Sequence, residues 1–185
     1  MSNIDSTKLK SAVRRTWSAE PSPKAQRYVG RFFDTIVVEN RIIAKVAGNH
    51  GTYTVSVEVK DKELVSACSC YIGKGGYCHH CEALALTYLQ NPASFTEVQP
   101  KKREDVKHVS DLHAYVQGVT LDSLLRQLSE KGITQKAFAE GISMNPRHLT
   151  AIKSSEARNH YYNELGATKL ACLWLLEHVA EFKGQ

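Results

Sequence analysis

The sequence has no long run of apolar residues among its 185 positions. A helix that crosses a bilayer needs about 20 predominantly apolar residues, so the composition argues against a membrane-spanning protein. The polar residues 1–6 also lack the apolar stretch of a secretory signal peptide. We therefore expect no membrane partner and a cytoplasmic location, where reducing conditions favour metal thiolates over disulfides.

Recognisable catalytic patterns are also missing. The segment from Gly73 to Gly76 is rich in glycine but lacks the spacing of a phosphate-binding P-loop. No pair of carboxylates accompanies the cysteine-rich stretch described below, and no nucleophile stands beside an evident base. The sequence thus predicts a protein that is not an enzyme.

Neither sign of charge dominates the chain, which has 24 Lys and Arg against 19 Asp and Glu. Residues 1–31 hold seven of the basic residues but only Asp5 and Glu20, which accounts for the whole excess of five. Residues 1–23 are therefore interpreted as a basic arm, which either follows a nucleic-acid backbone or is a solvated tail. Trp17 either stacks on a base or anchors this arm to the neighbouring domain.

The cysteines, in contrast, are concentrated in one stretch. Four of the five cysteines and two of the eight histidines lie between Cys68 and Cys81. Two close ligand pairs joined by a short glycine-containing span can supply the tetrahedral geometry of zinc. Cys68 and Cys70 form the first pair, and at the end of a strand their side chains point to the same side. A disulfide or a set of buried thiols is the alternative to a metal site.

The second ligand pair depends on where the following helix begins. If the helix already includes residues 78–81, Cys78 and Cys81 share one face. If Cys78 lies just before the helix, Cys78 and His80 converge instead. His79 and Cys81 thus remain alternatives to His80.

The order C-x-C, a seven-residue spacer, C-x-H and an apolar stretch over residues 82–89 resembles a SWIM zinc finger. The preceding β-like segments from Gly30 onward are similar to that family too, and the resemblance covers about residues 24–93. It implies Zn2+ held by Cys68, Cys70, Cys78 and His80. Four protein ligands close the coordination sphere, so such a metal stabilises the fold and takes no part in catalysis. SWIM-like modules bind DNA in some cases and proteins in others, so the expected partner of this domain is either DNA or a protein.

The pattern around the cysteines predicts a small antiparallel sheet covered by a helix. Segments near 31–38, 41–47, 52–59 and 63–69 are rich in β-branched and aromatic residues and are separated by turn residues. A helix over about 79–90 follows and stops at Asn91 and Pro92. Residues 94–118 are polar with little periodicity and are interpreted as a linker.

The remaining residues, 119–185, predict an all-helical domain. Apolar residues recur at helical spacing after Thr120 and after Thr134, which are suitable caps, and a third helix begins at Asn145 and Pro146. An apolar helix from Thr168 to about residue 182 packs in the core or forms a homodimer.

Residues 134–152 resemble the helix-turn-helix of Cro and repressor-like DNA-binding domains. The apolar positions of that motif fall on Phe138, Ala139, Ile142, Met144, Leu149 and Ile152. The usual turn glycine is replaced by Ser143, which must adopt the turn conformation at some strain. Such patterns also occur in plain helical bundles, so packing or partner binding is the alternative.

The resemblance implies that the helix from Pro146 enters the major groove of double-stranded DNA. Arg147 is then the expected bidentate partner of guanine. The residues expected to face bases are Asn145, Arg147, His148, Thr150 and Ala151, and those expected to contact phosphates are Gln135, Lys136, Lys153 and Arg158.

Together these features predict an α+β protein in which a zinc-binding sheet domain, residues 24–93, is joined to a helix-turn-helix domain, residues 119–185. The pairing favours a prokaryotic or phage transcriptional regulator. The alternative is a non-enzymatic adaptor whose zinc module docks on a recombination, repair or nuclease partner.

Overall fold

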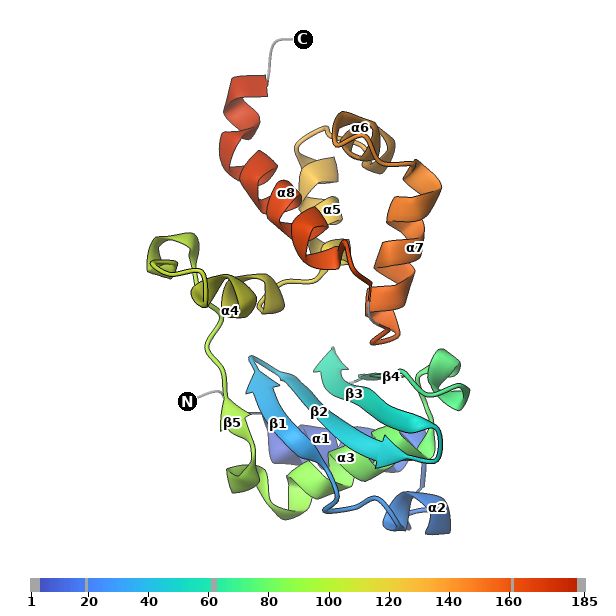
Figure 1. Cartoon of the computed structure of the whole chain (residues 1–185). Helices are drawn as coiled ribbons and strands as arrows, with labels where there is room; N and C mark the ends of the chain where they lie inside the picture. Colours follow the sequence, from blue (N-terminus) through green and yellow to red (C-terminus); the bar gives the residue numbers. More distant parts are fainter. Residues whose placement is uncertain (1–3, 19, 61–62, 161, 183–185) are drawn as a thin grey trace. The chain divides into compact units, whose positions relative to one another are not determined.

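The computed structural model describes residues 4–18, 20–60, 63–160 and 162–182. Within these ranges the chain forms eight α-helices and five strands, an α+β fold as the sequence predicts. It divides into two compact units (Figure 1). Unit 1 comprises residues 1–99 with 158–160, and unit 2 comprises residues 100–157 with 161–185.

Unit 1 is built on a sheet with the strand order β4-β3-β2-β1-β5. Strands β1 to β4 pair antiparallel in chain order, and the short β5 lies parallel to β1. Alternate residues of β2, such as Ile42, Ala44 and Val46, are buried, as the period of two requires. The strands are β1 (Phe33–Val38), β2 (Arg41–Gly48), β3 (Gly51–Lys60), β4 (Glu63–Cys68) and β5 (Thr96–Glu97).

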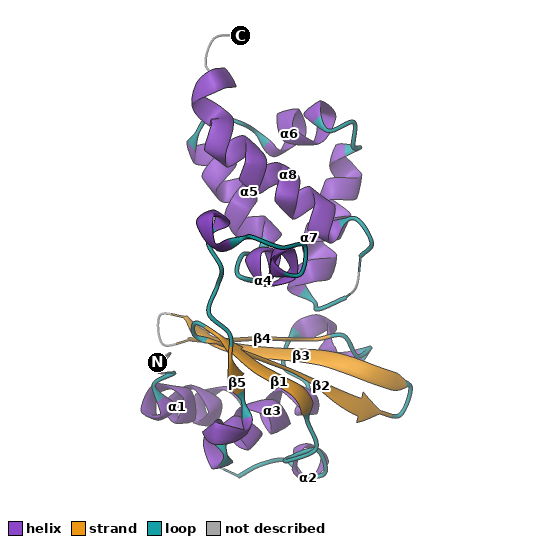
Figure 2. Ribbon diagram, turned by 60° about the vertical axis from the view of Figure 1, so that its left-hand side comes forward, coloured by secondary structure: helices purple, strands orange, loops and turns teal. Residues whose placement is uncertain are grey.

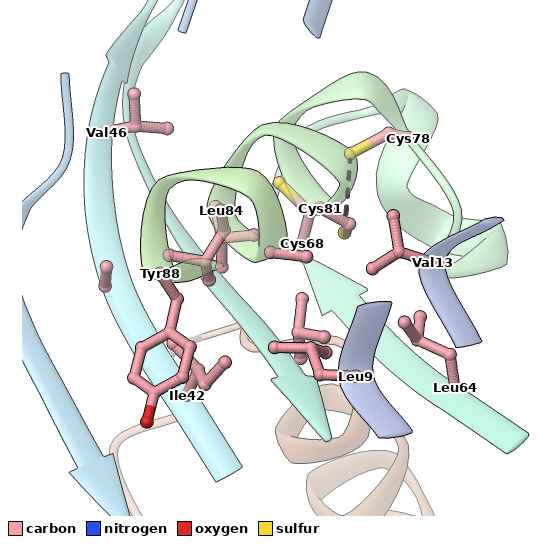
Figure 3. Packing of buried hydrophobic residues seen from close by; sticks show 14 of the residues in the cluster. Leu9, Val13, Ile42, Val46, Leu64, Cys68, Cys78, Cys81, Leu84 and Tyr88 are labelled. Carbon is pink, nitrogen blue, oxygen red and sulfur yellow. Dashed lines mark hydrogen bonds between the residues drawn. The ribbon is translucent and has the colours of Figure 1, made fainter. Parts of the chain in front are cut away.

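Helices α1 (Ser6–Thr16) and α3 (His79–Gln90) cover one face of this sheet (Figure 2). Asp5 caps α1 by accepting hydrogen bonds from the backbone of Thr7 and Lys8. The short α2 (Pro23–Gln26) packs against α3. Buried side chains from both layers fill the space between them (Figure 3), including Leu9, Val13, Ile42, Val46, Leu64, Leu84 and Tyr88.

Part of the segment interpreted from sequence as a linker, residues 94–118, is ordered structure. Phe95 is buried in an edge-to-face contact with Tyr88, with ring centroids 5.1 Å apart. This apolar contact holds the next two residues beside β1, where they form β5. The sequence pattern does not predict this strand, because the segment is polar and a single aromatic side chain, Phe95, holds it in place.

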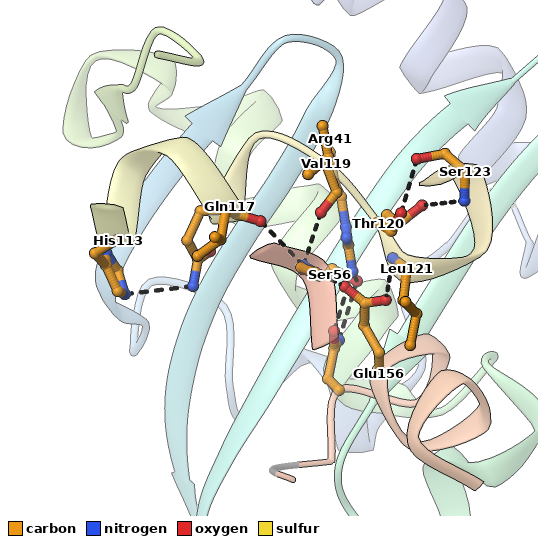
Figure 4. Close-up of polar contacts among 12 residues, drawn as sticks. Arg41, Ser56, His113, Gln117, Val119, Thr120, Leu121, Ser123 and Glu156 are labelled. Carbon is orange, nitrogen blue, oxygen red and sulfur yellow. Dashed lines mark hydrogen bonds and ion pairs between the residues drawn. The ribbon is translucent and has the colours of Figure 1, made fainter. Parts of the chain in front are cut away.

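Unit 2 contains α4 (Asp111–Gln117), α5 (Leu121–Glu130), α6 (Gln135–Gly141), α7 (Pro146–Ala157) and α8 (Leu165–His178). Thr120 and Thr134 cap α5 and α6 through their side-chain oxygens, as predicted, and Figure 4 shows the Thr120 bond to Ser123. Helix α8 begins at Leu165, three residues before the predicted start at Thr168. The core includes Leu121, Leu124, Leu125, Leu128, Phe138, Leu149, Ile152 and Cys172.

Helices α5 and α6 end in the same way but with different residues. Gly132 follows α5 with φ 86°, and Ser143 follows α6 with φ 57°. In both, the next residue donates its backbone N–H to a carbonyl in the last helical turn, Ile133 to Leu128 and Met144 to Ala139. These are Schellman motifs, whose left-handed position favours glycine. The prediction that Ser143 must adopt the glycine conformation is therefore confirmed.

Four short 3-10 helices complete the described structure: Ile72–Gly75, Pro92–Ser94, Arg103–Asp105 and Val179–Phe182. Among the described residues, none of the helices combines the length and apolar character needed to span a bilayer.

Candidate metal centre

The cysteine-rich stretch lies where β4 ends and α3 begins. Cys68 is the last residue of β4, opposite Val55 of β3, and Cys70 follows two residues later. The 3-10 helix Ile72–Gly75 then reverses the chain. Cys78 has extended backbone angles and immediately precedes α3, while His80 is the second residue of that helix. Of the two arrangements that the sequence leaves open, the helix start therefore favours convergence of Cys78 with His80.

Four possible ligand atoms come together at this point. The Sγ atoms of Cys68, Cys70 and Cys78 and a ring nitrogen of His80 all lie within 4.8 Å of one another, and all four residues are buried. Nδ1 of His80 is 3.7 Å from the Cys68 sulfur and 3.8 Å from the Cys78 sulfur. In a tetrahedral zinc site, neighbouring ligand atoms lie roughly 3.5 to 3.8 Å apart, given bonds of about 2.3 Å to sulfur and about 2.0 Å to nitrogen. The geometry can hold a metal ion.

The imidazole of His80 is fixed by its neighbours. Its ring centroid lies 4.5 Å from that of Tyr28, edge to face, and 5.2 Å from that of Tyr53. Its Nε2 is buried without a hydrogen-bond partner, whereas Nδ1 faces the sulfurs. Nδ1 is therefore the nitrogen placed to bind a metal. Neither tyrosine could be assigned to this site from the sequence, because both lie far from the cysteines along the chain.

Backbone amides also point at the sulfurs. The N–H of Cys70 donates to the Cys68 sulfur at 3.5 Å, and the N–H of Gly73 donates to the Cys70 sulfur at 3.1 Å. Such donors stabilise thiolates, which are the metal-binding form of cysteine. Position 73 also has no room for a side chain, because a Cβ there would collide with the carbonyl of Cys68.

The thiols influence one another's ionisation. Hydrogen bonds from Cys68 and then Cys81 lower the pKa of the Cys78 thiol. The hydrogen bond to Cys78, followed by the one to Cys81 and burial, raises the pKa of Cys68. The cluster thus stabilises one thiolate, that of Cys78. Without a cation, its neighbours oppose the ionisation of a second thiol. A bound divalent cation reverses this balance and favours several thiolates at once.

The two alternatives to His80 lie at the edge of the cluster. The Cys81 sulfur is 3.7 Å from that of Cys78, but Cys81 is not one of the four residues whose ligand atoms all lie within 4.8 Å of one another. Figure 3 shows Cys68, Cys78 and Cys81 together at this end of α3. His79 is half-buried, and its ring packs against those of Tyr28 and His80.

The residues predicted to contact DNA are mostly on α6 and α7. Arg147, Thr150 and Ala151 are exposed on α7, whereas Leu149 and Ile152 are buried on its opposite face. Gln135 and Lys136 are exposed at the start of α6, where Lys136 pairs with Glu140 at 3.8 Å.

Four of the residues predicted to contact DNA have neighbours within the protein that indicate other roles. Asn145 uses its Oδ1 to accept a 2.8 Å hydrogen bond from the backbone of Arg147, so it caps α7. Lys153 pairs with Asp122 of α5 at 3.2 Å. His148 lies 3.4 Å from the Tyr162 hydroxyl and 3.9 Å from the Glu164 carboxylate. Arg158 follows the end of α7 and groups with unit 1.

Comparison of the chain with protein-family models, with curated proteins and with solved structures found no match in any of the three.

Proposed function

We propose that Cys68, Cys70, Cys78 and His80 bind one zinc ion that stabilises unit 1. The support is the donor set of three thiols and one imidazole, which zinc prefers, at spacings suited to a tetrahedron. Four protein ligands fill the sphere, and their burial leaves no approach for a substrate. Metal binding then contributes to the folding free energy of this unit.

We further propose that the protein binds double-stranded DNA through α7 and acts as a transcriptional regulator. The observation that carries this proposal is the exposed row of Arg147, Thr150 and Ala151 on a helix anchored through Leu149 and Ile152. Helix α6, the turn at Ser143 and α7 then form a helix-turn-helix, with α7 as the recognition helix in the major groove.

The contacts described above refine the roles of the side chains. Arg147 is the residue expected to bind guanine through two hydrogen bonds. Gln135 and Lys136 are expected to contact phosphates. Asn145 contributes mainly as the cap of α7, because its oxygen is already engaged.

The test is fluorescence anisotropy of the zinc-loaded full chain with a pool of duplex DNA at two salt concentrations. We expect salt-sensitive binding, and we expect Arg147→Ala to lose sequence preference by about 1 to 3 kcal/mol. Arg126→Ala is the matched control, because it removes the same charge from an exposed position on α5. An absence of binding at low salt would contradict the proposal and favour the adaptor function, in which the metal-binding unit docks on a protein.

A further inference from the structure

The basic residues of α1 lie on the exposed part of the helix. Leu9, Ala12 and Val13 bury one side of the helix against the rest of unit 1. The rest of the helix surface exposes four cationic side chains, and α1 itself contains no acidic residue. The four are Lys8, Lys10, Arg14 and Arg15. The arm is therefore a folded helix with a cationic solvent face, which we call the α1 face.

Three carboxylates lie near the α1 face, those of Asp5, Glu82 and Glu63. Asp5, the cap of the helix, lies 3.5 Å from Lys8. The neighbouring helix α3 has a single carboxylate, Glu82, which is only 4% exposed. Both oxygens of Glu82 are used by Ser22, through its backbone N–H at 3.0 Å and its hydroxyl at 2.8 Å. Glu63 of β4 is exposed and lines a surface hollow together with Arg15. The α1 face thus has four cations against two exposed carboxylates, Asp5 and Glu63, and its net positive charge suits a polyanion.

The exposed ring of Tyr77 lies next to Trp17, the residue that follows α1. The Trp17 indole donates a 3.3 Å hydrogen bond to the backbone carbonyl of Tyr77, and the two rings meet edge to face with centroids 6.4 Å apart. The Tyr77 hydroxyl donates to the carbonyl of Leu64 at 3.3 Å. These contacts fix the orientation of Tyr77, yet the residue remains 57% exposed. A ring held in this way can stack on a flat ligand with little loss of entropy.

Tyr77 and Arg15 also line the same surface hollow. Its volume is about 420 Å³, and its other lining residues are Ala12, Thr16, Glu63 and Leu64. The hollow therefore combines a cation, an exposed aromatic ring and a hydrogen-bond acceptor, the Glu63 carboxylate. Exocyclic amino groups of nucleobases donate to such carboxylates.

We propose that the α1 face and Tyr77 bind single-stranded nucleic acid. Phosphates lie along Lys8, Lys10, Arg14 and Arg15, and an unpaired base stacks on Tyr77. A single strand is favoured over a duplex because the bases of a duplex are stacked on one another and present no free face to a protein ring. This surface belongs to unit 1 and shares no residue with α7 of unit 2, so the inference goes beyond the proposed recognition of duplex DNA.

The experiment measures binding of a fluorescent single-stranded oligonucleotide of mixed sequence to the zinc-loaded full chain over a range of salt concentrations. Replacing all four cations of the α1 face by glutamine should reduce the slope of log K against log salt by about three, given about 0.7 per phosphate contact. The matched control replaces four exposed cations of unit 2, Lys102, Lys107, Arg126 and Lys131, by glutamine and should leave the slope unchanged.

Variants of Tyr77 test the stacking. Tyr77→Ala should weaken single-strand binding about tenfold or more, whereas Tyr77→Phe should keep most of it, because the aromatic face remains. Metal content and far-ultraviolet circular dichroism of each variant show whether unit 1 is folded.

Two results would overturn the proposal. One is wild-type single-strand affinity in the folded glutamine variant of the α1 face. The other is an equal loss of duplex and single-strand binding in that variant together with no effect of Tyr77→Ala, which would reveal a plain phosphate surface. The Arg147→Ala measurement on duplex DNA tests the proposal for α7 separately, so either proposal can fail while the other stands.

Discussion

Lys169 of α8 and Glu156 of α7 form an ion pair of 2.6 Å in the interior of unit 2, where their side chains are only 8% and 13% exposed. The ammonium also donates to the backbone carbonyls of Val116 at 3.1 Å and Val119 at 2.7 Å. The second carboxylate oxygen of Glu156 accepts from the backbone N–H of Leu121, the first residue of α5, at 2.7 Å (Figure 4). The pair thus joins α7 and α8 to the start of α5, where a negative charge also interacts favourably with the helix dipole.

Removal of one member of this pair should be costly. We expect Lys169→Met to lower the free energy of unfolding by about 3 to 5 kcal/mol, because Glu156 is left buried without its partner. Urea unfolding at neutral pH measures the change, with Lys131→Met at an exposed position as the control. The double variant Lys169→Met with Glu156→Gln should recover part of the loss. If Lys169→Met lowers the free energy of unfolding no more than Lys131→Met does, this interpretation of the ion pair is wrong.

The sequence predicts regular elements well and long-range polar contacts poorly. The strands and the helix starts at Thr120 and Thr134 follow from periodicity and capping residues, which are local signals. Lys169 gives no such signal, because its partners at positions 116, 119 and 156 are defined only once the helices pack. β5 has no local signal for the same reason, since it depends on the contact of Phe95 with Tyr88.

The candidate metal centre was predictable to a similar extent. Dense Cys and His residues identify the stretch, but the choice between His80 and Cys81 depends on where α3 begins. The structure places that start at His79, directly after Cys78. The aromatic rings of Tyr28 and Tyr53, which hold His80, could not be assigned because tertiary packing alone brings them there.

Ser143→Gly should stabilise the protein. Ser143 has φ 57°, in the left-handed region that costs a side-chain-bearing residue about 1 kcal/mol or more. Glycine removes this strain but loses more backbone entropy on folding, so we expect a net gain of up to about 1 kcal/mol in urea unfolding. Gly132 occupies the equivalent position after α5 with φ 86°, so Gly132→Ser should have the opposite effect. A loss of stability in Ser143→Gly would show that the serine side chain contributes more than its backbone costs.

Asp111 should make unit 2 sensitive to acid. The ammonium of Lys101 at 2.6 Å, followed by the backbone N–H groups of Lys107 and His108, holds the pKa of this carboxyl well below its ordinary value. A depressed pKa in the folded state contributes stability above the unfolded pKa of about 3.9, and this stability is lost as the pH falls through the folded value.

We therefore expect Asp111→Asn to lower the melting temperature at pH 7, and the difference from wild type to shrink as the pH falls below about 4. Thermal unfolding followed by circular dichroism between pH 7 and pH 2.5 measures it. Asp105→Asn is a control, because it changes an exposed carboxylate of the same unit that accepts a hydrogen bond from only the backbone N–H of Lys102, at 3.3 Å, among the bonds described. A difference that stays constant with pH would exclude a contribution from ionised Asp111.

The metal centre predicts different outcomes for two buried cysteines. Cys68→Ser should abolish stoichiometric zinc binding and destabilise unit 1, because the closed ligand set couples the metal to folding. Cys172 is equally buried in unit 2, and burial raises its pKa to about 12. Cys172 is not among the four residues whose ligand atoms converge, so Cys172→Ser should leave the zinc content unchanged, whatever its effect on packing. Elemental analysis of the purified variants measures the metal, and a chelator titration followed by circular dichroism measures its effect on the fold.

The same measurement distinguishes His80 from its alternatives. His80→Ala should lose zinc, because Nδ1 of His80 faces the sulfurs of Cys68 and Cys78 at 3.7 and 3.8 Å. Cys81→Ala and His79→Ala should each retain one zinc ion per chain, since neither residue belongs to the four whose ligand atoms converge. Cobalt substitution adds a spectroscopic test, because charge-transfer absorption reports the number of thiolates bound. A spectrum of four thiolates in the wild type that falls to three in Cys81→Ala would assign the fourth ligand to Cys81 instead of His80.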